Sequence, residues 1–419
     1  MLEQYILPNK ARVYLLPQEN ALSTTTLIMY PVGSRYEPEK LSGVSHYIEH
    51  MMFKGTKKRK NAQILTREID RLGAEYNAFT SKEYTGYYIK AGAAYTKTAL
   101  DILSDMLFNS VYDAKEMEKE KGPVCEELRM YKDNPIMNID NLFEELLYDG
   151  CALGRDIGGT PTHVMSYKRA DVLKFRDRFY GPNNMHIFLA GHIGEEVREW
   201  IKSMYGTQKN SGTPSRVFDP GTLGASTASK RIRVEHKKTD QAQLMLGFPA
   251  FKYADEQNTA FRVLMGILGG SMSSRLFTEI REKRGLAYTV VASTETYRDV
   301  GYGYVRAGVE PKNINKTIAV VKKELEKLVT KGVTKRELAD AKTHIRGAME
   351  LSLEDSSTVA NWYAKQALFA NEILTPEEKL AKVDAVTAED IKKIAKKVFD
   401  WKKVRIAIIG DVETTDVRY

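Results

Sequence analysis

The sequence predicts an α+β protein made of two homologous halves, each an antiparallel sheet with helices packed on one face, joined by a linker. Three observations support this fold class. Short runs rich in β-branched residues alternate with stretches of helical periodicity. A segment rich in Gly, Ser, Thr and Pro separates two parts of nearly equal length. A tyrosine-rich run occurs in both parts, which indicates a duplicated unit.

The composition is that of a globular protein long enough for two or more domains, with 42% hydrophobic and 28% charged residues. No run of about 18 apolar residues occurs, so we expect no membrane span. The net charge of +8 is not gathered into a basic arm, which argues against a nucleic-acid partner. The first residues do not resemble a signal peptide, and Cys125 and Cys151 do not make a disulfide framework. We therefore expect a cytoplasmic location.

Strand and helix signals alternate along the first half. Strands are predicted where β-branched and aromatic residues gather between polar turn residues. Helices are predicted where apolar residues recur at helical spacing before a glycine or a polar stop. The expected strands are 12–16, 24–30, 76–80 and 85–90, the last two forming a hairpin across a polar turn, and the expected helices are 61–72, 97–107 and 115–131.

The middle of the chain carries the predicted linker. Residues 206–229 are rich in small and turn-forming residues and would join the halves 1–205 and 230–419. The repeated run occupies residues 78–92 and 292–308, so the copies are about 216 to 219 residues apart. Chance similarity between tyrosine-rich strands is the alternative explanation.

Two of the seven histidines lie four residues apart with a glutamate between them: His46, Glu49 and His50. In a helix, positions i and i+4 lie on the same face, so both imidazoles would point to one side. Two imidazoles make half of a zinc site, and a nearby carboxylate can act as a general base. The order H-x-x-E-H is the signature of inverted zinc peptidases. An amphipathic helix with two structural histidines would show the same pattern.

A catalytic zinc site needs a third protein ligand, and an acidic helix downstream offers several carboxylates. These include Glu120, Glu126 and Glu127. Adjacent helix residues point about 100° apart, so only one of Glu126 and Glu127 can face the histidine pair. The residues alone leave that choice open. The other five histidines are scattered without metal-ligand spacing, so we expect one zinc ion per chain.

Together these motifs resemble the pitrilysin, insulysin and mitochondrial processing peptidase family of zinc peptidases. The resemblance implies that His46 and His50 are ligands and that Glu49 is the general base. It also implies a third ligand about 77 residues after the second histidine, with a supporting glutamate seven residues earlier. These are Glu127 and Glu120, respectively. The resemblance covers nearly the whole chain, and its matching stretches are 46–56, 77–80, 126–130, 133–135, 273–276 and 281–288.

One stretch departs from the family pattern. Gly122 and Pro123 lie between Glu120 and Glu127. A proline inside a helix removes a backbone hydrogen bond and usually kinks the helix. We therefore expect a kink between the two glutamates, which bears on the role of Glu120 more than on that of Glu127.

The second half lacks zinc ligands at the corresponding positions. Projection of the three ligands across the repeat reaches the neighbourhood of Arg262, Gly266 and Arg346. The resemblance implies that Arg281 and Tyr288 instead hold the substrate backbone and stabilise the tetrahedral intermediate, as donors directed at a developing oxyanion. Without the resemblance, Arg281 would be interpreted as a solvated charge on a helix.

The expected function is zinc-dependent hydrolysis of extended or unfolded peptides inside a closed chamber. Residues 1–205 would be the zinc-bearing catalytic half and residues 230–419 a substrate-binding half. The peptide would add as a strand along Asn77, Ala78 and Phe79, through backbone pairing that is poor at reading sequence.

Large members of the family carry four such units in one chain, whereas this chain has two. We therefore expect a homodimer, or alternatively a heterodimer with a zinc-less homologue. The alternative function is that of a non-catalytic core or partner subunit of a peptidase or respiratory-type complex. A metal-dependent regulator that binds peptides is a third possibility.

Overall fold

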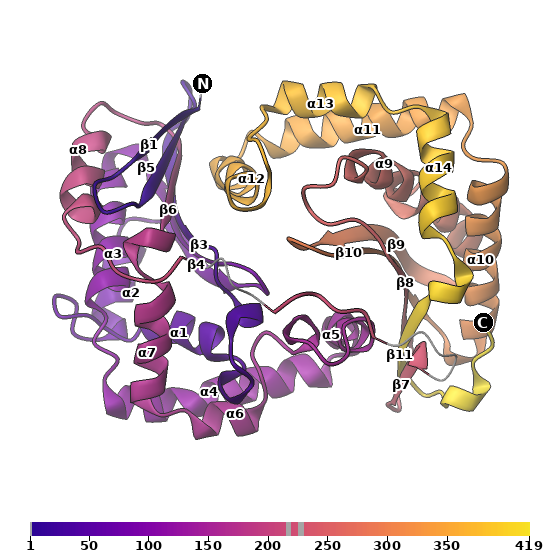
Figure 1. Cartoon of the computed structure of the whole chain (residues 1–419), viewed down its shortest axis with the longest axis horizontal. Coiled ribbons are helices and arrows are strands. Elements are labelled where there is room, and N and C mark those ends of the chain that lie inside the picture. Colours follow the sequence, from indigo (N-terminus) through magenta and orange to yellow (C-terminus); the bar gives the residue numbers. More distant parts are fainter. Residues whose placement is uncertain (1, 215–218, 225–229) are drawn as a thin grey trace. The chain divides into compact units, whose positions relative to one another are not determined.

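The chain folds into two compact units, each built from one β-sheet and its helices (Figure 1). The structure, a computed structural model, describes residues 2–214, 219–224 and 230–419. The predicted α+β class with two sheets is confirmed. The first unit comprises Met1–Arg129, Arg155–Asp219 and Ser352–Leu368, and the second unit comprises Met130–Gly154, Pro220–Leu351 and Phe369–Tyr419.

The first unit contains a six-stranded sheet with the order β1-β2-β6-β3-β5-β4. Neighbouring strands are antiparallel except β2 and β6, which run parallel. The predicted hairpin is confirmed as β4 and β5, and β4 is an edge strand. The strands are β1 (Glu3–Ile6), β2 (Arg12–Pro17), β3 (Ser23–Tyr30), β4 (Glu75–Thr80), β5 (Thr85–Gly92) and β6 (His186–Gly191).

Helices pack on both faces of this sheet. Side chains alternate along each strand, so Leu15 and Ile28 join the core that contains the apolar residues of α1, α3 and α7. On the opposite face, the Thr25 hydroxyl hydrogen-bonds the Ser356 hydroxyl of α12 at 2.8 Å. The helices of this unit are α1 (Val44–Met52), α2 (Ala62–Asp70), α3 (Thr96–Asn109), most of α4 (Ala114–Asp133), α6 (Pro161–Ser166), α7 (Arg169–Phe179), α8 (Val197–Ile201) and most of α12 (Ser356–Phe369).

The second unit contains a five-stranded sheet with the order β7-β11-β8-β10-β9, in which only β7 and β11 run parallel. Leu244 and Leu246 of β8 face one core, while Met245 between them packs with Leu142 and Phe143 of α5. The strands are β7 (Ile232–His236), β8 (Ala242–Pro249), β9 (Ala287–Thr296), β10 (Gly301–Val309) and β11 (Arg405–Gly410), and the helices are α5 (Pro135–Leu147), α9 (Asn258–Gly269), α10 (Ile314–Thr330), α11 (Lys335–Ser352), α13 (Pro376–Asp384) and α14 (Ala388–Val398).

The duplication predicted from the tyrosine-rich run is visible in the strand order. When β2, β3, β4, β5 and β6 are matched in sequence to β7, β8, β9, β10 and β11, both sheets have the same order and the same single parallel pair. The register places Thr80 opposite Thr85 and Thr296 opposite Gly301, so Thr80 and Thr296 occupy equivalent positions. In this register Ala78 corresponds to Thr294. The repeated sequence runs, which begin at Ala78 and Ala292, differ from this match by two residues at their start.

The compact units are discontinuous in sequence, whereas the sequence predicted continuous halves. Helix α5 precedes the predicted linker but belongs to the second unit, and α12 follows the linker but belongs mostly to the first unit. Part of the linker predicted at 206–229, namely residues 215–218 and 225–229, lies outside the described residues. Among the helices that the structure describes, none combines the length and the apolar character needed to cross a bilayer.

Candidate metal centre

Helix α1 presents its polar residues on one side and its apolar residues to the core. Tyr47, Ile48 and Met51 are fully buried, while His46 and His50 are half-buried on the remaining face. This division follows from the helical period, because residues three to four apart share a face. The predicted helical spacing of the two histidines is therefore present.

The N-terminus of α1 is held by a carboxylate from outside the helix. Gly43, at the N-cap position, has no side chain to cap the helix. The Glu37 carboxylate caps it instead, by accepting hydrogen bonds from the backbone N–H groups of Gly43 at 2.6 Å and Ser45 at 2.7 Å. Gly43 has a φ of +91°, and a Cβ there would lie 2.1 Å from the carbonyl oxygen of Gly158. Glycine is thus required where the loop that contains Gly158 meets the start of α1.

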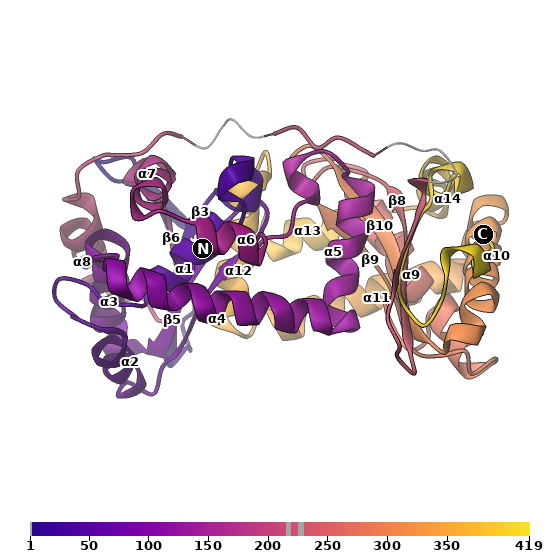
Figure 2. The ribbon, with the colours of Figure 1, turned by 90° about the horizontal axis from the view of Figure 1, so that it is seen from below.

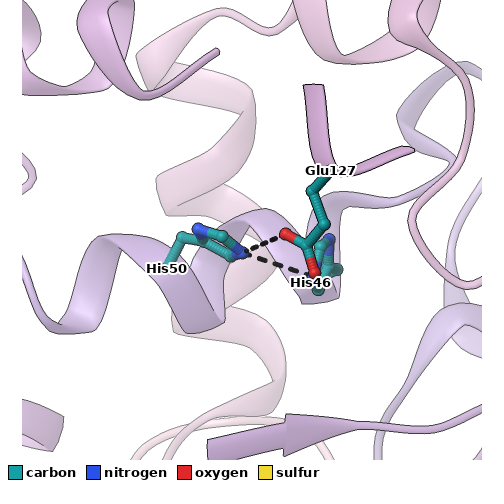
Figure 3. Close-up of side chains that lie close together, drawn as sticks. All are labelled: His46, His50 and Glu127. Atoms are coloured by element: carbon teal, nitrogen blue, oxygen red, sulfur yellow. Dashed lines mark hydrogen bonds and ion pairs between the residues drawn. The ribbon is translucent and has the colours of Figure 1, made fainter. Parts of the chain in front are cut away.

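Three side chains converge on one point: His46 and His50 of α1 and Glu127 of α4 (Figure 3). The two Nε2 atoms are 3.3 Å apart. The carboxylate oxygens of Glu127 lie 3.2 Å from Nε2 of His50 and 3.7 Å from Nε2 of His46. Two nitrogens bound to one tetrahedral zinc at about 2.0–2.1 Å are about 3.3–3.4 Å apart. The donor set and its spacing therefore fit a zinc ion.

Glu126 points elsewhere. Its side chain is exposed and forms an ion pair with Arg129 one helical turn along α4. Because adjacent helical residues point about 100° apart, Glu127 faces the histidines while Glu126 faces solvent. Of the two adjacent glutamates, Glu127 is therefore the one that lies beside both histidines.

Glu120 lies behind His50. Its Oε1 is 3.0 Å from Nδ1 of His50, and its Oε2 is 2.6 Å from Nζ of Lys54. Helix α4 runs uninterrupted as Ala114–Asp133 although Pro123 lies inside it (Figure 2). Glu120 and Glu127 are two helical turns apart and both contact His50, so Pro123 does not separate them. A carboxylate on Nδ1 orients the ring and directs Nε2 toward a metal.

The charges of the cluster are strongly coupled. The imidazoles of His46 and His50 hold the pKa of Glu127 well below its usual range. Burial opposes a charged His50 ring, but hydrogen bonds to Glu120 and Glu127 raise the pKa of His50 to about 9. Such perturbed groups clustered on half-buried helices are typical of functional sites.

Glu49 lies on the same face of α1, where one described residue forms a hydrogen bond with its side chain. The Thr80 hydroxyl at the end of β4 donates a hydrogen bond to Oε2 of Glu49 at 2.5 Å. Burial raises the pKa of Glu49, against the effect of this hydrogen bond. The sequence patterns alone assign no role to Thr80 or to Lys54. Both lie in the stretches that resemble the family, which is the signal that could have found them.

The three residues predicted to bind substrate lie on the edge strand. Asn77, Ala78 and Phe79 pair with β5 on one side of β4, and no described strand pairs with the other side. Asn77 is exposed and Ala78 is buried, as expected from the alternation along a strand. Phe79 packs edge-to-face on Tyr84.

Arg281 and Tyr288 lie in the second unit and contact each other. Arg281 belongs to a π-helical turn, η8 (Phe277–Glu282), and Tyr288 lies on the edge strand β9. The guanidinium stacks on the Tyr288 ring at 4.7 Å and donates to the Tyr288 carbonyl at 3.1 Å. The side chain of Tyr288 is 70% exposed, so its hydroxyl is available to a ligand.

The described residues of the second unit hold no comparable metal cluster. Arg262 and Gly266 lie on α9, and Arg346 on α11 pairs with Asp384 at 2.7 Å. Among the residues that the structure describes, His46, His50 and Glu127 form the only group of three or more suitable side chains.

Comparisons with known proteins identify relatives over most of the chain. A family model described as insulinase (peptidase family M16) matches residues 12–160, and a model described as peptidase M16 inactive domain matches residues 166–345. The chain is 32% identical to an uncharacterized zinc protease of Bacillus subtilis, over 95% of this chain and 96% of the relative. It is also 32% identical to an uncharacterized zinc protease of Streptomyces coelicolor, over 97% and 89% of the two chains.

Solved structures show the same fold. A protease from Helicobacter pylori superposes with a TM-score of 0.90 and 24% identity, over 98% of this chain and 99% of that chain. A peptidase M16 inactive domain from Pseudomonas fluorescens gives a TM-score of 0.90 and 18% identity, over 99% and 98%. The first family model lies within the first half, the second begins in that half and extends into the second, and the relatives extend over nearly the full length. The resemblance noted in the sequence is thereby confirmed, and the chain belongs to the M16 family of peptidases.

Proposed function

We propose that this protein is a zinc-dependent endopeptidase that hydrolyses extended or unfolded peptides. The convergence of His46, His50 and Glu127, with Glu49 on the same helix face, carries the proposal. This is the number of protein ligands that a catalytic zinc site uses, and it leaves a coordination position open. The names of the relatives as zinc proteases support the same metal.

Each residue of the site has a distinct part in this chemistry. When three such ligands hold it, a zinc ion would supply the Lewis acidity that activates water near neutral pH. Glu49 accepts the proton of the attacking water and returns it to the leaving amine. Burial, which raises the pKa of Glu49, suits a group that must both take up and release a proton. Glu120 orients the His50 ring through Nδ1.

The substrate is proposed to bind as an added strand on β4. An edge strand offers unpaired backbone groups at Asn77, Ala78 and Phe79, and an extended peptide can pair with them. Folded proteins cannot present such a segment, so the substrate class is unfolded or extended peptides. In the second unit, Arg281 and Tyr288 are proposed to bind the peptide carbonyl in a chamber closed around the substrate.

The assembly that we propose is a homodimer, with one zinc ion per chain and two equivalent sites. A heterodimer with a zinc-less homologue is the alternative. A native mass measurement of the purified protein distinguishes these assemblies from a monomer.

A non-catalytic role is the competing candidate. The model that matches residues 166–345 is described as an inactive domain, which favours a partner subunit for at least that part of the chain. The set of ligands and base in the first unit argues against this reading for the protein as a whole, because a subunit that only supports others does not need a general base beside a metal site.

A peptidase assay distinguishes the candidates. An unstructured peptide carrying a fluorophore and a quencher should be cut by the purified protein, and a chelator should stop cleavage until zinc is restored. Glu49→Gln should retain zinc, and its turnover rate should fall by about 10²–10⁴-fold, which is the typical contribution of general base catalysis. Glu127→Gln should lose zinc, while Glu126→Gln is the matched control and should retain it. Parental turnover in chelator, or full activity of Glu49→Gln, would refute the proposal.

A further inference from the structure

The general base of the proposed reaction has one hydrogen-bond partner in the protein. Thr80 Oγ1 donates to Oε2 of Glu49 at 2.5 Å, and no other described residue hydrogen-bonds to this carboxylate. A hydrogen bond to a charged acceptor is short and strong, and it fixes the orientation of the acceptor. With Oε2 engaged by Thr80, Oε1 is the oxygen left to accept a proton from water.

The backbone that carries Thr80 is held rigidly. The turn after β4 was predicted as a polar turn, yet Lys82 and Glu83 are only 3% and 2% exposed. Glu83 pairs with the buried guanidinium of Arg35 at 2.8 Å, and Lys82 donates to the carbonyl of Arg155. The backbone N–H of Arg35 also donates to the carbonyl of Lys82 at 2.9 Å. A buried ion pair and several hydrogen bonds therefore fix the end of β4.

The segment that meets this turn also depends on a glycine. A Cβ at Gly33 would lie 2.0 Å from the carbonyl oxygen of Ser81, so residues 33–35 approach the turn as closely as backbone allows. The contacts of this turn thus fix the backbone at the end of β4, from which the Thr80 hydroxyl reaches Glu49.

We infer that Thr80 is a positioning residue for catalysis, which orients the Glu49 carboxylate so that Oε1 faces the attacking water. The inference rests on the proposed function of Glu49 as general base. Thr80 directly follows the strand residues proposed to bind the peptide, so one rigid strand sets the position of both the substrate and the base. A small misplacement of a reacting group has large effects on rate.

The duplication supplies an internal control. Thr296 occupies the position of Thr80 in the second sheet, at the end of β9 opposite Gly301. Thr85 and Gly301 are equivalent positions and lie 216 residues apart. The same offset places Met265 at the position equivalent to Glu49. Met265 is buried and offers no carboxylate, so the same threonine has no base to orient there.

The test compares Thr80→Val, Thr80→Ser and Thr296→Val in the full chain, with the quenched peptide as probe. Thr80→Val should lower kcat about tenfold, a part of the about 10²–10⁴ that a general base contributes, with KM and zinc content unchanged. Thr80→Ser retains the hydroxyl and should restore kcat to within about twofold of the parent. Thr296→Val should cut at the parental rate.

A double-mutant cycle decides whether Thr80 acts through Glu49. In the Glu49→Gln background, Thr80→Val should have no further effect on the residual rate. A further loss of rate of about tenfold when Thr80→Val is added to Glu49→Gln would overturn the inference. A loss of zinc in the Thr80→Val single variant, or parental kcat in that single variant, would also overturn it. If the parent itself shows no chelator-sensitive cleavage, the proposed function fails together with this inference, whereas a fully active Thr80→Val in an active parent overturns the inference alone.

Discussion

The two units share one strand order and one parallel pair, but among the described residues only the first carries a candidate metal centre. Helix α1 of the first unit has His46 and His50 on its exposed side, and the matching positions of α9 hold Arg262 and Gly266. The comparison shows that the sheet and its helices form one scaffold, on which a few side chains decide whether a zinc site exists.

The edge strands of the two sheets also differ in the side chains that lie at their ends. Strand β4 ends at Thr80, whose hydroxyl contacts Glu49, whereas β9 places Tyr288 and the stacked Arg281 at its start. Both edges are open to an added strand in the described residues. The duplicated scaffold thus offers acidic and metal-binding groups in one copy and cationic and phenolic donors in the other.

The largest expected effect comes from removing a metal ligand in the first unit. His50→Ala should reduce zinc from about one ion per chain to a trace and abolish peptide cleavage, because two remaining ligands do not hold zinc tightly. Arg262→Ala, at the position corresponding to His46 in the second unit, should leave zinc content unchanged. Zinc measured by elemental analysis tests both. A content near two ions per chain would break the comparison.

A smaller effect is expected from the donors of the second unit. Arg281→Ala and Tyr288→Phe should lower kcat and kcat/KM together by about 10²-fold, the loss typical of one oxyanion donor. Zinc content and thermal stability should match the parent, since Tyr288 is largely exposed and Arg281 is partly exposed. Steady-state kinetics with the quenched peptide measures the effect. Parental rates in both variants would make the second unit a scaffold without a catalytic part.

The smallest effect concerns a carboxylate that is structural. Glu337 accepts both Nε and Nη2 of Arg275, at 2.6 and 2.9 Å. Burial opposes its ionisation, but Arg275 and Thr334 lower the pKa of Glu337 to about 2, from an ordinary value of 4.5. A carboxyl with a depressed folded-state pKa stabilises the fold above its unfolded-state pKa, and this stability is lost as pH falls through the folded-state pKa.

Glu337→Gln should therefore lower the midpoint of thermal unfolding by about 2–4 °C above pH 5, the shift that about 1 kcal/mol gives a domain of this size. The difference from the parent should shrink as pH falls from about 4.5 toward 2. Glu326→Gln, at an exposed position on α10, is the control and should follow the parent. A difference that is constant with pH would exclude the ion pair as its source. Zinc content should not change, in contrast to the loss expected for Glu127→Gln.

Much of this fold could be predicted from local pattern. The hairpin of β4 and β5 and the helices α2, α3 and α4 fall within a few residues of their expected bounds, because periodicity and turn residues are local signals. The histidine pair of the candidate metal site could be predicted because His46 and His50 lie one helical turn apart. The choice of Glu127 as candidate third ligand needed the family resemblance, since a single carboxylate on a distant helix has no local signature.

What the sequence did not predict depends on contacts between distant residues. Lys82 and Glu83 look like an ordinary polar turn, and only the buried Arg35, some fifty residues away in sequence, explains why they are inside. Thr80 looks like any strand residue until Glu49 is placed beside it. Pro123 suggested a disturbed helix, but the packing of α4 against α1 retains both glutamate contacts to His50.

The exchange of α5 and α12 between the units affects how the chain can acquire its structure during synthesis. The ribosome completes the strands of the first sheet early, but Thr25 and Ser356 are 331 residues apart, so the face that α12 covers remains bare until most of the chain has emerged. Helix α5 emerges before any strand of the sheet it covers. Nascent domains usually fold one after another. Here the first unit, which holds the candidate metal ligands, can be completed only once residue 368 has been made, and by then most of the second unit has emerged without its strand β11.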